Sequence, residues 1–216
     1  MFIVLDGLDG CGKSTQFNRL LSAHPELYGI SFPEYDKPSA TLVKMYLGGE
    51  FSDSPDGVNA YAASTFYAAD RYASFKLYWE SVYRSGRSIL ASRFVSSNII
   101  HQMPKLDKSE WDSFIDWIDD YEYGKLQLPR PDKVLLLDIP VDVSQRRLSE
   151  RYAADGGHKD LHESDTAYME HCRSAALYAA ERCGWRVISC VDGGRELTED
   201  EICCALEHEL SETATG

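Results

Sequence analysis

The chain has 216 residues, 44% of them hydrophobic, and a formal net charge of −13 at pH 7. A chain of this length buries enough surface to form a core without disulfides or a structural metal. No apolar run approaches the ~18 residues that would span a membrane. The negative charge argues against nucleic-acid polymers as partners, because phosphate backbones favour basic surfaces. Nucleotides stay compatible with it, since a small anion needs only a local positive cavity.

The six cysteines form neither a C-x-x-C pair nor a His-paired zinc spacing. The N-terminus lacks the basic segment of a signal peptide and leads directly into an apolar run. We therefore expect reduced thiols and a cytoplasmic location. No repeat or linker divides the sequence, which predicts one domain over residues 1–216.

Short apolar runs alternate with helical patterns along the chain. In order, we expect a strand at Phe2–Leu5, a loop at Gly7–Gly12, helices at Ser14–Ala23, Thr41–Leu47 and Val58–Ser85, a strand at Ser88–Ala91, an amphipathic helix at Lys108–Tyr121, a strand at Val134–Asp138, a helix at Asp142–Tyr152, a mobile loop at Ala153–His162, a helix at Ser164–Arg182 and a strand at Arg186–Cys190. A capping box at Thr198–Glu201 opens a final helix that runs to Leu210. This alternation predicts a three-layer α/β fold with a parallel central sheet flanked by helices.

The segment Gly7–Thr15 matches the phosphate-loop pattern G-x-x-x-x-G-K-[ST] between an apolar strand and a helix. In this context backbone N–H groups turn inward on a phosphate, and the helix N-terminus adds partial positive charge. We expect Lys13 to reach the β- and γ-phosphates of ATP and the Ser14 hydroxyl to face Mg²⁺. The predicted ATP-binding residues are Gly7, Gly10, Cys11, Gly12, Lys13, Ser14 and Thr15.

A phosphate loop alone does not separate kinases from GTPases and motor ATPases. The absence of an N-K-x-D motif weakens the GTPase interpretation. Asp138 ends an apolar strand, as a magnesium-holding aspartate of a motor would, but no glutamate follows it. It is either such a residue or a strand-end residue.

Transfer of a phosphoryl group between two nucleotides brings several negative charges together, so arginines should converge from other elements. Arg71 and Arg93 are the best candidates, because each sits beside apolar or aromatic residues instead of in a charged run. Further candidates surround the glycine-bearing loop: Arg146, Arg147, Arg151 and Lys159.

These features, taken in order, resemble the thymidylate kinase family over nearly the whole chain. The stretches that carry the resemblance are Leu5–Gln16, Phe32–Tyr35, Phe66–Arg71, Arg93–Asn98, Pro131–Pro140 and Asp160–Glu163. The resemblance implies ATP-dependent phosphorylation of a deoxynucleoside monophosphate, dTMP by preference, with ATP and Mg²⁺ as cofactors. It also implies a homodimer and a short lid over residues 147–163 that closes on ATP.

The resemblance also assigns roles to individual residues. Asp9 would contact the 3′-hydroxyl of the acceptor or the metal region, and Ser14, Asp9 and Glu163 would lie near Mg²⁺. Arg93 would bind the acceptor phosphate, and Arg71 the base. Around them, the implied pocket residues are Phe32, Tyr35, Tyr67, Ser97, Asn98 and His101, with Tyr67 stacking on the pyrimidine and Asn98 bonding the base edge.

Some thymidylate kinases carry a catalytic arginine inside the phosphate loop, and others supply it from the lid. Here the loop has Gly10-Cys11, so the charge would come from Arg147 or Arg151. Cys11 itself either fills the loop as a small residue or is an oxidation-sensitive thiol.

Three positions depart from the family pattern. Ser92 stands where an aspartate usually precedes the arginine, so Asp9 or Glu163 compensates or turnover is slower. Glu34 occupies a position that is sometimes arginine, with Lys37 as a possible substitute. His101 falls where a tyrosine often guards against a 2′-hydroxyl, and it is either a selectivity residue or a solvent-facing helix residue.

Two rival functions stay open at this stage. One is a kinase for another acceptor, either a different monophosphate or a deoxynucleoside, which Ser92, Asn98 and His101 make credible. The other is a nucleotide-dependent switch that hydrolyses ATP slowly and acts through partners.

Overall fold

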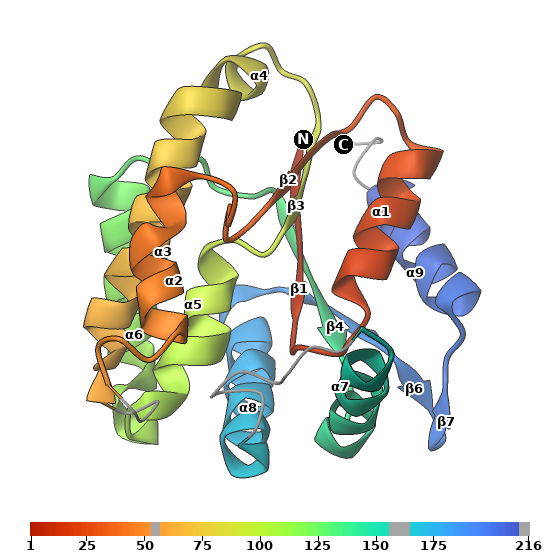
Figure 1. The fold of residues 1–216 in the computed structure, drawn as a ribbon. Coiled ribbons are helices and arrows are strands. Elements are labelled where there is room, and N and C mark those ends of the chain that lie inside the picture. The colour runs from red at the N-terminus through yellow and green to blue at the C-terminus, as the bar shows by residue number, and fades with distance from the viewer. Residues whose placement is uncertain (53–56, 156–164, 212–216) are drawn as a thin grey trace.

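A computed structural model of the chain describes residues 1–52, 57–155 and 165–211. Its centre is a parallel sheet in the order β2-β3-β1-β4-β5 (Figure 1). The strands are β1 Phe2–Gly7, β2 Tyr28–Ser31, β3 Ile89–Ser92, β4 Lys133–Asp138 and β5 Arg186–Ser189. Since β1 pairs with β3 on one side and β4 on the other, the loop that follows β1 leaves from the middle of the sheet. The predicted parallel α/β architecture is confirmed.

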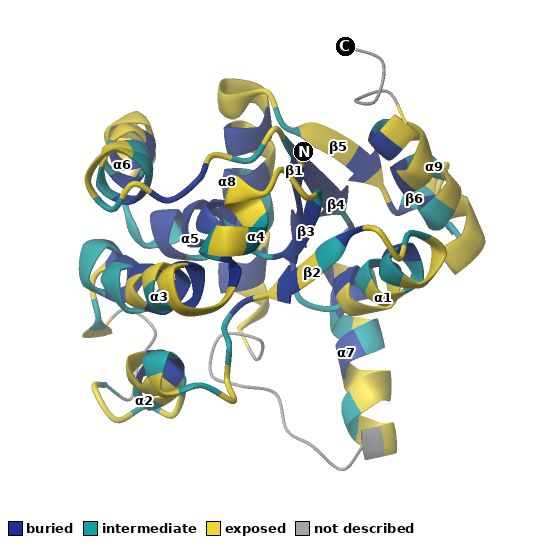
Figure 2. Cartoon of the chain, turned by 90° about the horizontal axis from the view of Figure 1, so that it is seen from above, coloured by how far each residue is buried: buried dark blue, intermediate teal, exposed yellow. Residues whose placement is uncertain are grey.

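Helices cover both faces of this sheet, and Figure 2 shows the buried strands enclosed between them. One face is covered by α1 (Lys13–Ala23) and α9 (Glu199–Ser211), which pack on each other. The other is covered by α5 (Val95–Gln102) and α8 (Thr166–Cys183), with α3 (Ala60–Ser74) outside α5. The remaining helices are α2 Thr41–Leu47, α4 Glu80–Arg84, α6 Trp111–Ile118 and α7 Val141–Asp155.

The core follows the apolar periodicity of the sequence. Strand β1 is buried along its whole length, as is the Val134–Leu137 run of β4. On α6 the buried residues are Trp111, Phe114, Ile115 and Ile118, as their helical spacing predicts. The capping box that opens α9 is also confirmed, because the Thr198 backbone N–H donates to Glu201 (2.8 Å) while the Glu201 backbone N–H donates to Thr198 Oγ1 (3.2 Å).

The structure corrects several predicted elements. Strand β2, helix α5 and the short hairpin β6 (Val191–Asp192) and β7 (Arg195–Glu196) were not predicted. The long helix expected at Val58–Ser85 begins at Ala60, where the Asn59 side chain accepts the Ala62 N–H, and changes to a π-helical segment, η3 (Phe75–Trp79), before α4. A second π-helical segment, η6 (Asp119–Lys125), follows α6.

The C-terminal end of α7 also differs from expectation. Residues 153–155 were predicted to start a loop but belong to this helix, since Ala153 and Ala154 are strong helix formers. The rest of the predicted loop, from residue 156, lies outside the described residues. No helix in the described ranges is long and apolar enough to cross a membrane.

Candidate active site

The phosphate loop lies between the end of β1 and the start of α1. Lys13 is buried at the first position of α1, and its Nζ donates to the carbonyls of Gly7 and Leu8 at 2.7 Å each. Gly12 caps the helix with a φ of 94°, a left-handed conformation that suits glycine. The loop thus presents a helix N-terminus and an ammonium group at the carboxyl edge of the sheet, where parallel α/β proteins bind ligands.

Helix α7 packs directly against this loop. Ser144 Oγ donates to the carbonyl of Asp9 at 2.5 Å. Gly10 has a φ of 80°, and a Cβ added there would lie 2.7 Å from the carbonyl oxygen of Ser144. An arginine at position 10 would therefore collide with α7, so this position of the loop cannot hold a catalytic arginine.

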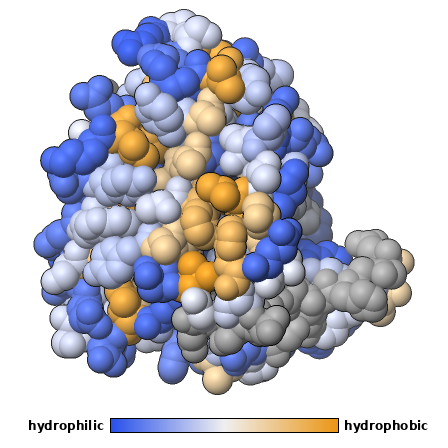
Figure 3. Space-filling model, turned by 60° about the vertical axis from the view of Figure 1, so that its left-hand side comes forward, coloured by the Kyte–Doolittle hydropathy of each residue, from blue (hydrophilic) through white to orange (hydrophobic). Residues whose placement is uncertain are grey.

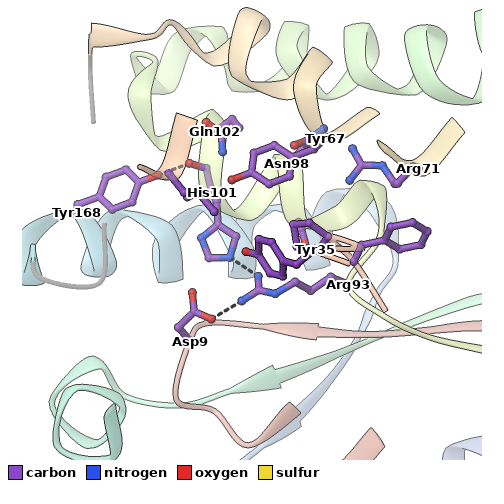
Figure 4. Close-up of a pocket in the computed structure, with 13 residues that line it drawn as sticks. Asp9, Tyr35, Tyr67, Arg71, Arg93, Asn98, His101, Gln102 and Tyr168 are labelled. Carbon is purple, nitrogen blue, oxygen red and sulfur yellow. Dashed lines mark hydrogen bonds and ion pairs between the residues drawn. The ribbon is translucent and has the colours of Figure 1, made fainter. Parts of the chain in front are cut away.

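Arg93 lies at the point where β3 ends, with a φ of 66° that is rare for a residue with a side chain. Its guanidinium bonds Asp9 through Nη2 and lies 3.0 Å from His101 Nε2 through Nη1 (Figure 4). Left-handed backbone at a non-glycine residue costs about 1–3 kcal/mol and clusters at functional sites. The structure therefore joins three predicted site residues from β3, the phosphate loop and α5.

The charges of this group are fixed by their neighbours. Burial alone would raise the pKa of Asp9, but the positive charges of Arg93 and Lys13 outweigh it and lower the pKa. Burial likewise opposes the charge of Arg93, yet Asp9 and Asp6 raise its pKa. Burial and the charge of Arg93 together lower the pKa of His101 to about 3. At neutral pH the group is a carboxylate, a guanidinium and a neutral imidazole.

Asp6 is a site-adjacent carboxylate that sequence reasoning missed. It is fully buried, one residue beyond the Leu5–Ser92 pair of β1 and β3, and it accepts hydrogen bonds from Ser96 Oγ (2.6 Å) and Ser97 Oγ (2.7 Å). Asp6 is one of the carboxyl groups that raise the pKa of Arg93, so an acidic side chain lies near this arginine although the residue before it is Ser92. The signal in the sequence was an acidic residue inside an apolar strand.

A pocket opens beside Arg93, and its lining contains the predicted acceptor residues (Figure 4). They are Asp9, Phe32, Tyr35, Tyr67, Arg71, Arg93, Ser97, Asn98 and His101. The structure adds Pro33, Leu47, Gln102 and Tyr168, which sequence reasoning did not single out. Tyr168 of α8 donates its hydroxyl to the carbonyl of His101, so it buttresses α5 at this wall. His101 is thus a pocket residue and does not face solvent.

The far wall of the pocket is a buried polar cluster. Arg71 forms a two-pronged ion pair with Glu122, at 2.7 Å from Nε and 2.6 Å from Nη2. Asn98 Nδ2 donates to Glu122 Oε1 (2.9 Å) and to the Ser64 carbonyl (3.2 Å). Arg71, Asn98 and Glu122 are each at most 1% exposed. Sequence reasoning missed Glu122, the one charged residue that continues the buried face of α6.

A second pocket runs along the phosphate loop and shares Asp9, Phe32, Pro33, Tyr35 and Arg93 with the first. Besides Gly10 to Gln16, it is lined by two arginines of α7, Arg147 and Arg151, and by Leu197 and Glu199 from the C-terminal region. Arg147 donates to Glu196 Oε2 from Nε (3.1 Å) and Nη2 (2.9 Å), which leaves Nη1 facing the loop, 4.0 Å from a Cβ position built on Gly12. Arg146 pairs with the other oxygen of Glu196.

Other candidates lie away from both pockets. Asp138 accepts from Arg173 Nε at 2.8 Å and Nη2 at 2.9 Å, which favours the strand-end interpretation. Lys37 lies 4.7 Å from the centre of the Tyr78 ring and lines neither pocket. Lys159 and Glu163, one a candidate basic residue and the other a predicted metal neighbour, fall outside the described residues.

A phosphate-loop pocket that shares a wall with a second, aromatic- and arginine-lined pocket is the arrangement expected of a P-loop phosphotransferase. A family model described as thymidylate kinase matches residues 5–202. The chain belongs to the thymidylate kinase family.

Individual relatives agree with this assignment. The chain is 28% identical to a thymidylate kinase of Mycobacterium tuberculosis over 207 residues, which cover 90% of this chain and 94% of the relative. It is 30% identical over 159 residues to a probable thymidylate kinase of Thermococcus gammatolerans, covering 70% of this chain and 71% of the relative. A thymidylate kinase structure from Candida albicans, described as having broad substrate specificity, superposes with a TM-score of 0.69 at 21% identity, covering 99% of this chain and 92% of that one.

Proposed function

We propose that the protein transfers the γ-phosphoryl group of ATP to a deoxynucleoside monophosphate, dTMP by preference, yielding dTDP and ADP. The observation that carries this proposal is the shared wall of the two pockets, where Asp9 and Arg93 line both. A donor held by the phosphate loop and an acceptor held beside Arg93 would meet there. Holding two reactants in register supplies much of the catalysis in phosphoryl transfer.

The acceptor phosphate needs no general base, because its oxygens are already ionised at neutral pH. One such oxygen forms a bond to the γ-phosphorus of ATP while the bond to the β,γ-bridging oxygen breaks, and ADP leaves. Arg93 would hold the acceptor phosphate, and Lys13 would neutralise charge on the departing β-phosphate. Lys13 lines the donor pocket and its Nζ donates to two backbone carbonyls, so a phosphate oxygen bound in this pocket can replace one of them as hydrogen-bond acceptor.

The residues at the junction also suit the magnesium ion that such enzymes use. Ser14 is exposed in the donor pocket, and Asp9 is held ionised by its cationic neighbours. A hydroxyl and a carboxylate are oxygen ligands of the kind Mg²⁺ prefers, alongside phosphate oxygens and water. When bound, the ion would neutralise charge between the β- and γ-phosphates. Glu163 stays a predicted third neighbour.

The far wall of the acceptor pocket favours thymine over cytosine. Asn98 lines this pocket and turns its NH₂ group towards Glu122 and the Ser64 carbonyl, so Oδ1 is the amide atom left for the base. In this place Asn98 Oδ1 can accept a hydrogen bond from the N3–H of thymine. Cytosine has a lone pair on N3 and would place it against this oxygen.

The donor side would be completed by an arginine of α7. Arg147 already lies against the phosphate loop, while Arg151 lies one turn further along the same helix. We assign the charge-stabilising role to Arg147, whose Nη1 lies 4.0 Å from a Cβ position built on Gly12. A lid over residues 147–163 would close on ATP and exclude water.

We also propose that two copies associate. Large apolar side chains are exposed on α2, η3 and α3, among them Leu42, Tyr72, Tyr78 and Leu77, the last 69% exposed. Figure 3 shows apolar surface on the side of the molecule that carries α2, α3 and α6. A second copy would bury this surface. Light scattering of wild type and Leu77→Glu tests this, since the variant should show half the wild-type mass.

The function is tested by measuring ADP formation with dTMP, dUMP, dCMP, dGMP and thymidine as acceptors. We expect the highest kcat/KM with dTMP. Faster turnover with thymidine or another monophosphate would identify a different acceptor. An unchanged rate with every acceptor, together with a protein partner that binds only the ATP state, would instead support a switch.

A further inference from the structure

The buried carboxylate of Glu122 has no role in the phosphoryl transfer described above. It lies in the π-helical segment η6 and is 0% exposed. The buried face of α6 leads to it through Trp111, Ile115 and Ile118, so a charged side chain occupies a place where an apolar one would pack. A buried charge is costly unless it is paired and hydrogen-bonded, which makes its partners informative.

Both partners of Glu122 line the acceptor pocket. Arg71 bonds the carboxylate at 2.7 and 2.6 Å, and its Nη1 donates to the Phe94 carbonyl at 3.2 Å. Asn98 Nδ2 donates to Glu122 Oε1 at 2.9 Å. One carboxylate therefore anchors the guanidinium from α3 and the amide from α5 that form the far wall.

The carboxylate also decides which way the Asn98 amide faces. Its two neighbours on the inner side, Glu122 Oε1 and the Ser64 carbonyl, are both acceptors. Only the NH₂ group can face them, because an amide oxygen in that place would meet two other oxygens without a proton. The oxygen is left for the pocket, where it can accept a hydrogen bond and cannot donate one.

We propose that Glu122 is a positioning residue for base selection: by fixing the Asn98 amide and the Arg71 guanidinium, it makes the pocket take pyrimidines that carry an N3–H and reject those that do not. The proposal rests on the function proposed above. Thymine and uracil carry this N–H, and cytosine has a lone pair at the same atom. Without the carboxylate, only the more distant Ser64 carbonyl, at 3.2 Å, holds the NH₂ group inward, so the amide can turn over and offer that group to cytosine.

The test compares kcat/KM for dTMP, dUMP and dCMP in wild type, Glu122→Gln and Glu122→Asp. In Glu122→Gln an amide, with one oxygen and one NH₂ group, replaces a carboxylate that accepts through both oxygens. The dTMP:dCMP ratio of kcat/KM values should fall by about tenfold or more, as expected when a buried hydrogen bond no longer discriminates between the bases. The dTMP:dUMP ratio should stay within about twofold, since both bases present the same N3–H. A general loosening of the pocket would change both ratios. KM for ATP should not change.

Glu122→Asp covers the case in which Glu122→Gln does not fold, because it keeps the counter-charge of Arg71 while the shorter side chain withdraws from Asn98. It should also lower the dTMP:dCMP ratio of kcat/KM values. In a protein that already carries Asn98→Ala, adding Glu122→Asp should not lower this ratio further, because the amide that Glu122 positions is gone. Asp70→Asn is the matched control: this buried carboxylate neighbours Arg71 in sequence but bonds Glu34 N–H (2.9 Å) and Ser39 Oγ (2.5 Å).

The outcomes separate the two proposals. Wild type that shows no preference for dTMP over dCMP contradicts the proposed function, and the role of Glu122 with it. Wild type with a clear preference that persists in the folded Glu122 variants overturns the role of Glu122 alone. A control variant that loses selectivity as strongly as the Glu122 variants would also overturn it.

Discussion

The acceptor and donor pockets are built in different ways. The acceptor wall consists of polar side chains that are almost completely buried and bonded to one another, with Glu122 joining Arg71 and Asn98. The donor pocket is lined by two arginines of α7, Arg147 and Arg151, and the Arg147 side chain is 26% exposed and paired with Glu196. Buried, satisfied networks hold a fixed shape, whereas surface pairs are weak and exchange partners easily. Under the proposed function, acceptor choice would be preformed and donor-side charge would be recruited when ATP binds.

The two regions meet at Asp9 and Arg93, which belong to both pockets. This junction has features of each. It is buried enough to shift the pKa of His101, yet it opens to solvent on the donor side. Substitutions in each region should therefore affect different kinetic constants.

The largest effect is expected for Lys13→Ala on the donor side. Removing the ammonium from the phosphate loop should lower kcat by about 100- to 1,000-fold, since its charge acts on the transferring group. Thermal unfolding and the Kd for dTMP should stay close to wild type. Lys37→Ala is the control, because Lys37 lines neither pocket. Near-normal turnover by Lys13→Ala would show that the phosphoryl group is transferred elsewhere.

Arg93→Gln should have the next largest effect, and it should act on the acceptor side. Losing a charge-assisted bond to the acceptor phosphate lowers kcat/KM for dTMP by about 10- to 100-fold. KM for ATP should change much less. Steady-state kinetics with each substrate varied in turn distinguishes the two constants. An equal rise in the KM values for ATP and dTMP would contradict the assignment of Arg93 to the acceptor side.

A smaller effect is expected for the arginines of α7. Arg147→Ala should lower kcat by about tenfold with the Kd for dTMP unchanged, and Arg151→Ala should do less, because Arg147 lies closer to the loop. Arg146→Ala serves as the control, since Arg146 shares Glu196 but does not line the donor pocket. A larger loss in Arg151→Ala than in Arg147→Ala would reverse the assignment of the charge.

The smallest effect concerns stability at the junction. The pKa of His101 is lowered to about 3 from an ordinary 6.5, so between these values the unfolded chain binds a proton that the folded chain does not. The contribution of the neutral, buried His101 to the free energy of unfolding is therefore complete above pH 6.5 and is lost as pH falls towards 3. We therefore expect the free energy of unfolding, measured in urea, to fall less between pH 7.5 and pH 5 in His101→Gln than in wild type. The glutamine amide oxygen can still accept a hydrogen bond from Arg93. An equal fall in the two proteins would contradict a buried neutral imidazole.

The sequence predicted local features best. The phosphate loop and the strands β1 and β4 are visible because their signals lie within ten consecutive residues. Strand β2 escaped notice because it is four residues long, includes Gly29 and buries only Ile30. Helix α5 lacks a capping side chain at Phe94, and several of its polar residues serve the site instead of marking a solvent-facing surface.

In the candidate site, too, residues with a local sequence signal were predicted and their partners distant in the sequence were not. Arg71, Arg93 and Asn98 were predicted from their neighbours in the sequence and from the family resemblance, and the structure brings them to one pocket. Their partners could not be predicted in this way, because Glu122 lies 51 residues from Arg71 and Asp9 lies 84 residues from Arg93. The first pair depends on where α3 and η6 come together, and the second on where the phosphate loop meets the end of β3. The roles of individual residues, the extent of the single domain and the lid stay predictions.

The central claim, that one chain holds two nucleotides whose phosphates meet at Asp9 and Arg93, is tested most directly by calorimetric titration with a ligand in which adenosine and thymidine are joined through five phosphates. We predict one molecule bound per chain, displacement by ATP and by dTMP separately, and much weaker binding to Arg93→Gln. Binding that ATP displaces but dTMP does not would contradict the claim.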